Sequence, residues 1–231
     1  MRYEQVRQAK FLRRLNRFVA EVRLADGRRQ RVHVPNTGRC RELLVPGAQV
    51  VLSHSENPKR KLPDSLVSVY RGQRLVNIDS QNPNRLAAEA LAEGRLLGFV
   101  PSFLRREYSY GNSRLDLMFT APDGAHCLME VKGCTLEVEG RALFPDAPTL
   151  RGVKHLRELT AALAAGWRSY VVFVIQMKGV TEFCPNWETH RAFGETLAAA
   201  AAAGVRVLAF DSWVMPDRVV LADPVSVRLD P

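Results

Sequence analysis

The run Ser113-Arg114-Leu115-Asp116-Leu117-Met118-Phe119 is followed by Cys127-Leu128-Met129-Glu130-Val131-Lys132-Gly133, with a turn signal at Pro122-Asp123-Gly124 between them. This pattern predicts two strands joined as a hairpin, inside an antiparallel meander. Side chains two residues apart in a strand share one face, so Glu130 and Lys132 project together. The hairpin brings Asp116 close to both.

Two carboxylates and a lysine at such a hairpin indicate metal-assisted chemistry. Carboxylates on neighbouring strands bind a hard divalent cation such as Mg²⁺ or Mn²⁺, and the Val131 carbonyl is a further candidate ligand. Lys132 would orient a water or stabilise charge that develops on a phosphate. The alternative is an ordinary surface ion pair worth under about 1 kcal/mol. Asp116 argues against a surface ion pair, because an acid among apolar residues is costly to bury unpaired. The spacing alone leaves both the metal site and the ion pair open.

The residues around this hairpin predict a mixed α/β domain. Asn84 is a plausible cap for the first helix and Gly94 its stop. The order helix, meander, helix, strand, helix, strand is typical of this fold class. The predicted helices cover residues 85–93, 149–165 and 188–203, the meander covers 103–138, and the buried strands cover 169–175 and 205–210.

The first third of the chain has a different pattern. Short alternating runs predict strands, separated by turn signals such as Asp26-Gly27 and Pro46-Gly47. Five short strands in about eighty residues are typical of a small barrel, and the OB-fold is the natural candidate. We therefore expect two domains, residues 1–80 and residues 81–231. The five predicted strands are residues 18–24, 30–34, 49–52, 66–70 and 75–78.

Charge also separates these two parts. Residues 1–80 contain 17 lysines and arginines against 7 acidic residues, a net charge of +10, whereas residues 81–231 contain 16 against 17, a net of −1. A basic module beside a nearly neutral one indicates a polyanionic partner, bound by neutralising phosphates. A solvated basic face without a specific partner is the alternative. The asymmetry between the two parts favours the polyanionic partner.

Candidate nucleic-acid contacts occur in both parts. The arginines near residue 15 would follow a backbone, and the Asn36-Thr37-Gly38-Arg39 turn would hold a phosphate. The start of the helix at 149–165 carries cations where free amides favour an anion. His155 in that helix is interpreted as structural. The candidate contacts are Arg14, Arg17, Asn36, Arg39, Arg114, Arg151 and Lys154.

The composition predicts a cytoplasmic protein. No apolar run approaches the roughly 20 residues that a membrane span needs. The N-terminus begins with basic and polar residues rather than a secretory apolar region. The four cysteines lie far apart without a C-x-x-C pair, which argues against a disulfide framework or a structural zinc site. They are Cys40, Cys127, Cys134 and Cys184.

Several longer motifs resemble a known family, the sugar fermentation stimulation proteins (SfsA). Shorter matches at Leu15-Asn16-Arg17-Phe18 and Asn57-Pro58-Lys59-Arg60-Lys61-Leu62 extend the resemblance to nearly the whole chain. The D…ExK arrangement resembles the PD-(D/E)XK nuclease superfamily, although Leu115 stands where that signature has proline. The long motifs are His33-Val34-Pro35-Asn36-Thr37-Gly38-Arg39-Cys40, Gly111-Asn112-Ser113-Arg114-Leu115-Asp116, Glu130-Val131-Lys132-Gly133-Cys134-Thr135 and Phe144-Pro145-Asp146-Ala147-Pro148-Thr149-Leu150-Arg151-Gly152-Val153-Lys154-His155-Leu156.

The resemblance implies an OB-like barrel followed by a PD-(D/E)XK nuclease-like domain. It also implies nucleic acid as the partner, with DNA as the first candidate and RNA as the second. By position, Asp116 and Glu130 match the metal-binding acids and Lys132 the catalytic lysine. Glu89 is expected as the third metal ligand, from the preceding helix, with Glu93 one turn later as its competitor.

Two functions remain open at this point. One is a Mg²⁺-dependent phosphodiesterase that acts on DNA or RNA and needs the complete acid-acid-lysine set. The other is a non-catalytic DNA-binding regulator of sugar metabolism, notably maltose, which needs only the basic domain and would survive the loss of Asp116. A small-ligand-responsive regulator is a weaker third reading, because no pocket motif supports it.

Overall fold

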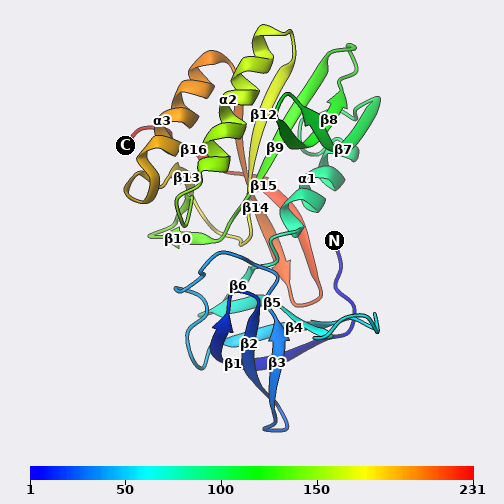
Figure 1. The fold of residues 1–231 in the computed structure, drawn as a ribbon, viewed down its shortest axis with the longest axis vertical. Coiled ribbons are helices and arrows are strands. Elements are labelled where there is room, and N and C mark those ends of the chain that lie inside the picture. The colour runs from blue at the N-terminus through cyan, green and yellow to red at the C-terminus, as the bar shows by residue number, and fades with distance from the viewer.

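The first domain of the computed structural model, which describes all of residues 1–231, is a closed barrel (Figure 1). Its five strands close in the order β1-β2-β3-β5-β4, because β3 pairs with β5 in parallel and β1 pairs with β4. This arrangement confirms the predicted OB-like fold. The strands are β1 (Val6–Asn16), β2 (Val19–Leu24), β3 (Arg29–His33), β4 (Gln49–His54) and β5 (Asp64–Arg71), with β6 (Arg74–Asn77) as an added edge strand.

The longest barrel strand, β1, was not predicted, and residues 75–78 form the edge strand β6 rather than part of the closed barrel. Ala9 and Phe11 are the only buried residues of β1, and the others are exposed or half-buried. Pairing on both sides of the strand holds it in the barrel. So few buried positions leave almost no apolar alternation in the sequence, which is why the pattern missed it.

The second domain is built on a mixed six-stranded sheet of order β15-β14-β12-β9-β8-β7. Its three central strands, β9, β12 and β14, run parallel, and the outer strands join them antiparallel. The predicted meander and mixed α/β class are therefore confirmed. The strands are β7 (Phe103–Tyr110), β8 (Ser113–Thr120), β9 (His126–Cys134), β12 (Arg168–Ile175), β14 (Arg206–Met215) and β15 (Arg218–Pro224).

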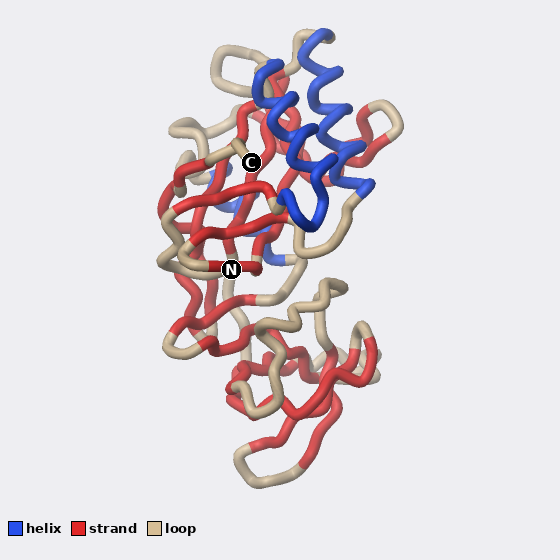
Figure 2. The backbone as a smooth tube through the Cα atoms, turned by 90° about the vertical axis from the view of Figure 1, so that its left-hand side faces the viewer, coloured by secondary structure: helices blue, strands red, loops and turns tan.

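Helices cover both faces of this sheet (Figures 1 and 2). α1 (Asn82–Ala92) packs on one face, and α2 (Leu150–Ala164) and α3 (Trp187–Ala203) pack on the other. β12 shows why its sequence is apolar throughout: Tyr170 belongs to the core around α1, whereas Phe173 belongs to the core around α2 and α3. α1 begins two residues before its predicted cap, Asn84.

A second, four-stranded sheet that the sequence did not predict lies beside the first. Its order is β10-β11-β13-β16, and each strand has four residues or fewer. Strands this short carry too few residues to show a period. The loop after β11 leads directly into α2. The strands are β10 (Leu136–Val138), β11 (Arg141–Phe144), β13 (Glu182–Pro185) and β16 (Ser226–Val227).

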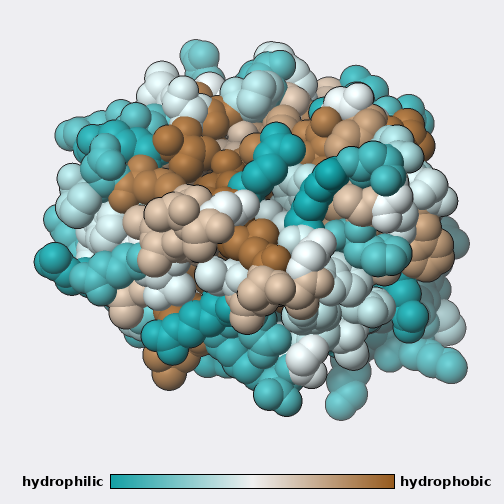
Figure 3. All heavy atoms as spheres, turned by 90° about the horizontal axis from the view of Figure 1, so that it is seen from above, coloured by the Kyte–Doolittle hydropathy of each residue, from teal (hydrophilic) through white to brown (hydrophobic).

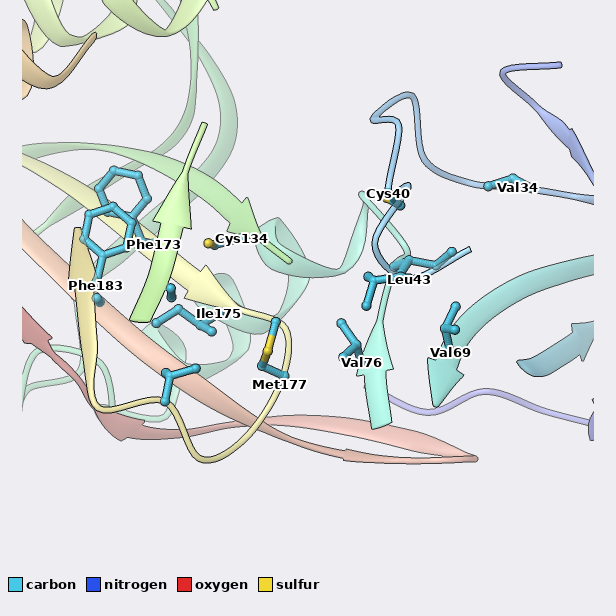
Figure 4. Close-up of a cluster of buried hydrophobic side chains, with 14 of the residues drawn as sticks. Val34, Cys40, Leu43, Val69, Val76, Cys134, Phe173, Ile175, Met177 and Phe183 are labelled. Carbon is cyan, nitrogen blue, oxygen red and sulfur yellow. The ribbon is translucent and has the colours of Figure 1, made fainter. Parts of the chain in front are cut away.

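The two domains share one core. A single cluster of 36 buried residues runs from Leu43 and Val76 of the barrel to Ile175 and Met177 of the second domain (Figure 4). The Asn77 amide also donates to the Gln176 carbonyl at 2.9 Å. Burial of apolar side chains across the junction therefore fixes the barrel against the sheet.

The first residues of the chain belong with the second domain, and the N-terminus lies beside its sheet rather than in the barrel (Figure 2). The Tyr3 amide donates to the Asp217 carbonyl at 2.7 Å, and Arg2 forms a bridge with Arg218 of β15. At the end farthest from the barrel, apolar side chains gather among polar ones (Figure 3). No helix combines the length and the apolar character that a membrane crossing demands.

Candidate functional site

The site forms where β8 and β9 separate. The two strands pair from Thr120 to Leu117, and the ladder ends there. One residue further, Asp116 Oδ2 accepts a hydrogen bond from the Val131 amide at 2.8 Å, in place of a ladder bond. The amide and carbonyl of one strand residue point to the same side, so the Val131 carbonyl faces the same gap.

Glu130 lies at the centre of a buried polar cluster. Its Oε1 accepts a hydrogen bond from Lys132 Nζ at 2.5 Å and another from Nδ1 of His155 on α2. Arg151 Nε lies 3.3 Å from the other ring nitrogen of His155. A guanidinium can only donate, so Nε2 of His155 accepts and Nδ1 carries the proton given to Glu130. The helix thereby orients this carboxylate from one side.

The pKa values of the two carboxylates shift in opposite directions. Burial, reinforced by the nearby charge of Glu130, raises the pKa of Asp116 to about 6. Burial would also raise the pKa of Glu130, but the hydrogen bonds and charges of His155 and Lys132 outweigh it, so its pKa lies below the usual value. Glu130 is therefore ionised at neutral pH, whereas Asp116 titrates near pH 6.

One oxygen of this cluster has no partner. Oε2 of Glu130 is buried and makes no hydrogen bond in a side chain that is only 3% exposed. A buried carboxylate oxygen without a donor is costly, and a cation would satisfy it. The residues present therefore fit a divalent metal bound by Asp116, Glu130 and the Val131 carbonyl, with oxygen atoms only.

The prediction that Glu89 is the third metal ligand is wrong. Its carboxylate binds the terminal amine of Met1 at 3.0 Å and is 48% exposed. The α1 residue that reaches the site is Asn84, whose Nδ2 donates to Asp116 Oδ1 at 2.6 Å. Five residues along a helix turn a side chain well away from the first, so the two cannot share one face. No group of three or more His, Cys, Asp or Glu side chains with metal-binding geometry occurs anywhere in the structure.

Two predicted phosphate contacts in the barrel, Arg14 and Asn36, hydrogen-bond to the backbone of the protein itself. Arg14 donates to four backbone carbonyls, those of Asn36, Gly38, Arg39 and Arg17, at 2.6–2.8 Å. Asn36 donates to the Ile78 carbonyl and accepts from the Gly38 amide. Their side chains shape the loop after β3, which corrects the prediction that they contact a phosphate.

The other predicted contacts differ in what they touch. Arg17 and Arg39 are exposed, make no ion pair, and both line a pocket of about 600 Å³. Arg114, on β8, lies 3.7 Å from Glu107 and is 61% exposed. Lys154 donates to the Asn112 carbonyl at 2.6 Å and thereby holds the β7–β8 turn against α2. Arg151 contacts His155 on the side away from Glu130, so it is the only cationic side chain of α2 that belongs to the carboxylate cluster.

His155 and Asn84 are site residues that the sequence reading did not assign. His155 is buried against Glu130 rather than serving only the helix. The signal was its place four residues after Arg151, which puts both on one face of α2. The sequence predicts Asn84 as a helix cap, but α1 starts earlier, at Asn82, and the Asn84 side chain reaches Asp116 on β8.

Comparison with known proteins agrees with this architecture. The family model described as SfsA N-terminal OB domain matches residues 12–78, and the model described as sugar fermentation stimulation protein RE domain matches residues 81–218. The chain belongs to the SfsA family. This membership confirms the resemblance carried by the sequence motifs.

Relatives extend over the full length of this SfsA-family chain. A sugar fermentation stimulation protein homolog of Desulfitobacterium hafniense is 48% identical over 229 residues, covering 99% of both chains. A homolog of the same description in Alkaliphilus oremlandii is 46% identical over 232 residues, covering 98% of both. The structure of Pyrococcus furiosus SfsA in complex with Ca²⁺ superimposes with a TM-score of 0.87 at 26% identity, over 99% of this chain and 98% of that one.

Proposed function

We propose that this SfsA-family protein is a metal-dependent nuclease that hydrolyses phosphodiester bonds in nucleic acid, with DNA as the first candidate. The observation that carries the proposal is the unpartnered, buried Oε2 of Glu130, held beside Asp116 and Lys132 where two strands separate. The Ca²⁺ complex of the Pyrococcus furiosus relative supports a divalent cation. The net charge of +9, concentrated in the barrel, supports a polyanionic substrate.

The side chains have separate roles in this proposal. Asp116 and Glu130 would hold the metal, and the Val131 carbonyl would complete the protein's share of its ligands. When bound, Mg²⁺ or Mn²⁺ supplies Lewis-acid polarisation and lowers the pKa of water. Lys132 places a positive charge where negative charge develops on the phosphate. His155 and Asn84 orient the two carboxylates and bind neither substrate nor metal.

The test combines metal binding with cleavage. We expect Mg²⁺ or Mn²⁺ to support cleavage of labelled single- or double-stranded DNA or RNA in gels, and EDTA to abolish it. Ca²⁺ should bind in calorimetry but support little turnover, because it is larger and positions a water less tightly. Asp116→Asn should lose both metal binding and cleavage. Asp123→Asn, an exposed acid on the turn of the same hairpin, is the matched control and should lose neither.

Two results would contradict the proposal. Cleavage that persists in Asp116→Asn would come from a contaminating nuclease. A wild-type protein that neither binds a divalent cation nor cleaves would leave the alternative role, a DNA-binding regulator of sugar metabolism genes, which the description of the relatives favours. That role predicts an affinity for DNA that changes neither with added metal nor with substitution of Asp116.

A further inference from the structure

A pocket of about 600 Å³ opens on the barrel at the junction with the second domain. Four of its nine lining residues are arginines, and none is acidic. Ala147, from the loop between β11 and α2, is the one lining residue that the second domain contributes. The arginines are Arg14, Arg17, Arg39 and Arg41, and we call this the arginine pocket.

Three of these arginines carry uncompensated charge. Arg17, Arg39 and Arg41 are exposed and form no ion pair or side-chain hydrogen bond with the protein. By contrast, Arg7 and Arg13 of β1 pair with Asp64 and Glu21. Guanidinium groups gathered without acids in a concave surface focus a positive potential and suit a phosphate.

The loop that carries two of these arginines is held in place before any ligand arrives. Arg14 is its anchor, because three of its hydrogen bonds, to the backbone carbonyls of Asn36, Gly38 and Arg39, wrap residues 36–39 around the guanidinium. Cys40, the next residue, is buried with φ at +45°, a conformation that a side chain other than glycine rarely adopts. Strain of this kind persists only where the surroundings enforce it. A rigid loop binds its ligand with little loss of conformational entropy.

A second cavity, of about 320 Å³, adjoins the arginine pocket between the two domains. The two share Thr37, Gly38 and Ala147. Gly38 makes the close approach possible, since a Cβ there would lie 2.8 Å from an Asp146 oxygen. Asp146 is the only charged residue among the cavity's lining, which otherwise offers uncharged polar and apolar groups such as Ser80, Thr135 and Gln176. Gly133, the residue after Lys132, also lines this cavity.

These features suit the two parts of a nucleotide. The arginine pocket has the charge for a phosphate, whereas the nearly uncharged cavity has the size and polarity for a nucleobase. A base that is paired inside a duplex cannot enter a cavity between two domains. Phe18, which follows Arg17 and is 49% exposed, offers a surface on which a further base can stack.

We propose that the arginine pocket binds a backbone phosphate of a single-stranded nucleic acid, whose neighbouring unpaired base enters the adjoining cavity between the domains. This inference rests on the proposed function in taking nucleic acid as the substrate. It adds that the strand follows the junction from the barrel toward Lys132, so the protein selects single strands or unpaired ends over continuous duplex.

The test measures binding without metal, so that its outcome is independent of cleavage. Fluorescence anisotropy would compare a labelled oligothymidylate with a labelled duplex of mixed sequence, in EDTA, for wild type and for Arg39→Ala with Arg41→Ala. The matched control is Arg29→Ala with Arg31→Ala, which removes the same charge from exposed positions of β3 outside the pocket.

We expect the wild type to prefer the single strand. The pocket variant should lose about tenfold or more in affinity for it, and the slope of log affinity against log salt should fall by roughly 0.7, for the one phosphate contact that is lost. The control pair should change both quantities clearly less. Circular dichroism would confirm that both variants are folded, which their exposed positions predict.

Three results would overturn the proposal. Equal losses in the pocket variant and the control pair would show a diffuse basic surface. Duplex binding as tight as single-strand binding would exclude the path between the domains. Inorganic pyrophosphate that binds the wild type in calorimetry, with strand affinity unchanged by the pocket substitutions, would assign the pocket to a small phosphorylated ligand. A wild type that binds strands as expected but never cleaves would overturn the proposed reaction and leave this inference standing.

Discussion

The gap between β8 and β9 and the arginine pocket of the barrel both concentrate charge of one sign, but they do so under opposite conditions. At the gap, Glu130 is buried, and Lys132 and His155 compensate it at hydrogen-bond distance. In the pocket, Arg17, Arg39 and Arg41 face solvent and have no partner. Water stabilises an exposed charge, whereas a buried one needs specific partners. Changes at the gap should therefore alter stability and turnover together, whereas changes at these three unpaired arginines should alter binding alone.

Lys132→Ala should have the largest effect on function. Its ammonium acts on charge that develops during the reaction, so we expect turnover to fall by about 10²- to 10³-fold. Affinity for Mg²⁺ should change by much less, because Lys132 is not a ligand. Single-turnover cleavage and calorimetry on the same preparation separate the two quantities. A loss of metal affinity as large as the loss of turnover would contradict this division of roles.

His155→Ala should have the largest effect on stability. The substitution leaves Glu130 buried with one partner fewer and opens a cavity in α2, so we expect a cost of about 3 kcal/mol in the free energy of unfolding. Urea unfolding in EDTA measures it. His155→Gln, which can still donate to Glu130, should recover part of the loss. Arg157→Ala, an exposed change on the same helix, should stay within about 0.5 kcal/mol of wild type.

Arg14 and Arg17 allow the same comparison within the barrel, because Arg14 is hydrogen-bonded to the protein whereas Arg17 is exposed and unpaired. Arg14→Ala removes the anchor of the loop after β3 and leaves several carbonyls without donors, so we expect a loss of about 2 kcal/mol in stability. Arg17→Ala should leave stability unchanged and weaken strand binding. Thermal unfolding and anisotropy distinguish these outcomes. Equal stability of the two variants would show that the loop does not depend on Arg14.

Asp116→Asn should stabilise the metal-free protein slightly at neutral pH. The folded pKa of about 6 lies above the ordinary aspartate value of 3.8, so folding favours the protonated form. The stability that this shift contributes is complete below the lower pKa and is lost as pH rises through the upper one. Above pH 6 we expect Asn to gain on the order of 1 kcal/mol, a sign opposite to that for His155→Ala.

The same shift makes metal binding sensitive to pH. The metal needs the ionised carboxylate, so protons compete with it below about pH 6. Affinity for Mg²⁺ should fall as the pH is lowered, approaching about tenfold for each further unit. Calorimetry across pH 5 to 8 measures this dependence. An affinity that stays constant over this interval would show that Asp116 is not a ligand.

The sequence by itself determined the local features. Alternation and turn signals predicted the hairpin with Asp116, Glu130 and Lys132, since a strand's period of two fixes which side chains share a face. The same signals predicted most barrel strands, and charge counts separated the basic part from the neutral one. These properties depend on residues near one another in the chain.

Only the tertiary structure decided which distant side chains meet. Glu89 and Asn84 lie on the same helix. Because of the angle at which α1 packs on the sheet, Asn84 contacts Asp116 and Glu89 contacts the N-terminal amine. His155 reaches Glu130 because α2 crosses the other face of that sheet. Among the basic residues, Arg14 became an anchor because the loop after β3 closes around it, and no local pattern distinguishes it from Arg17. Long-range packing sets such partners, since a side chain's role depends on the surface that folding brings against it.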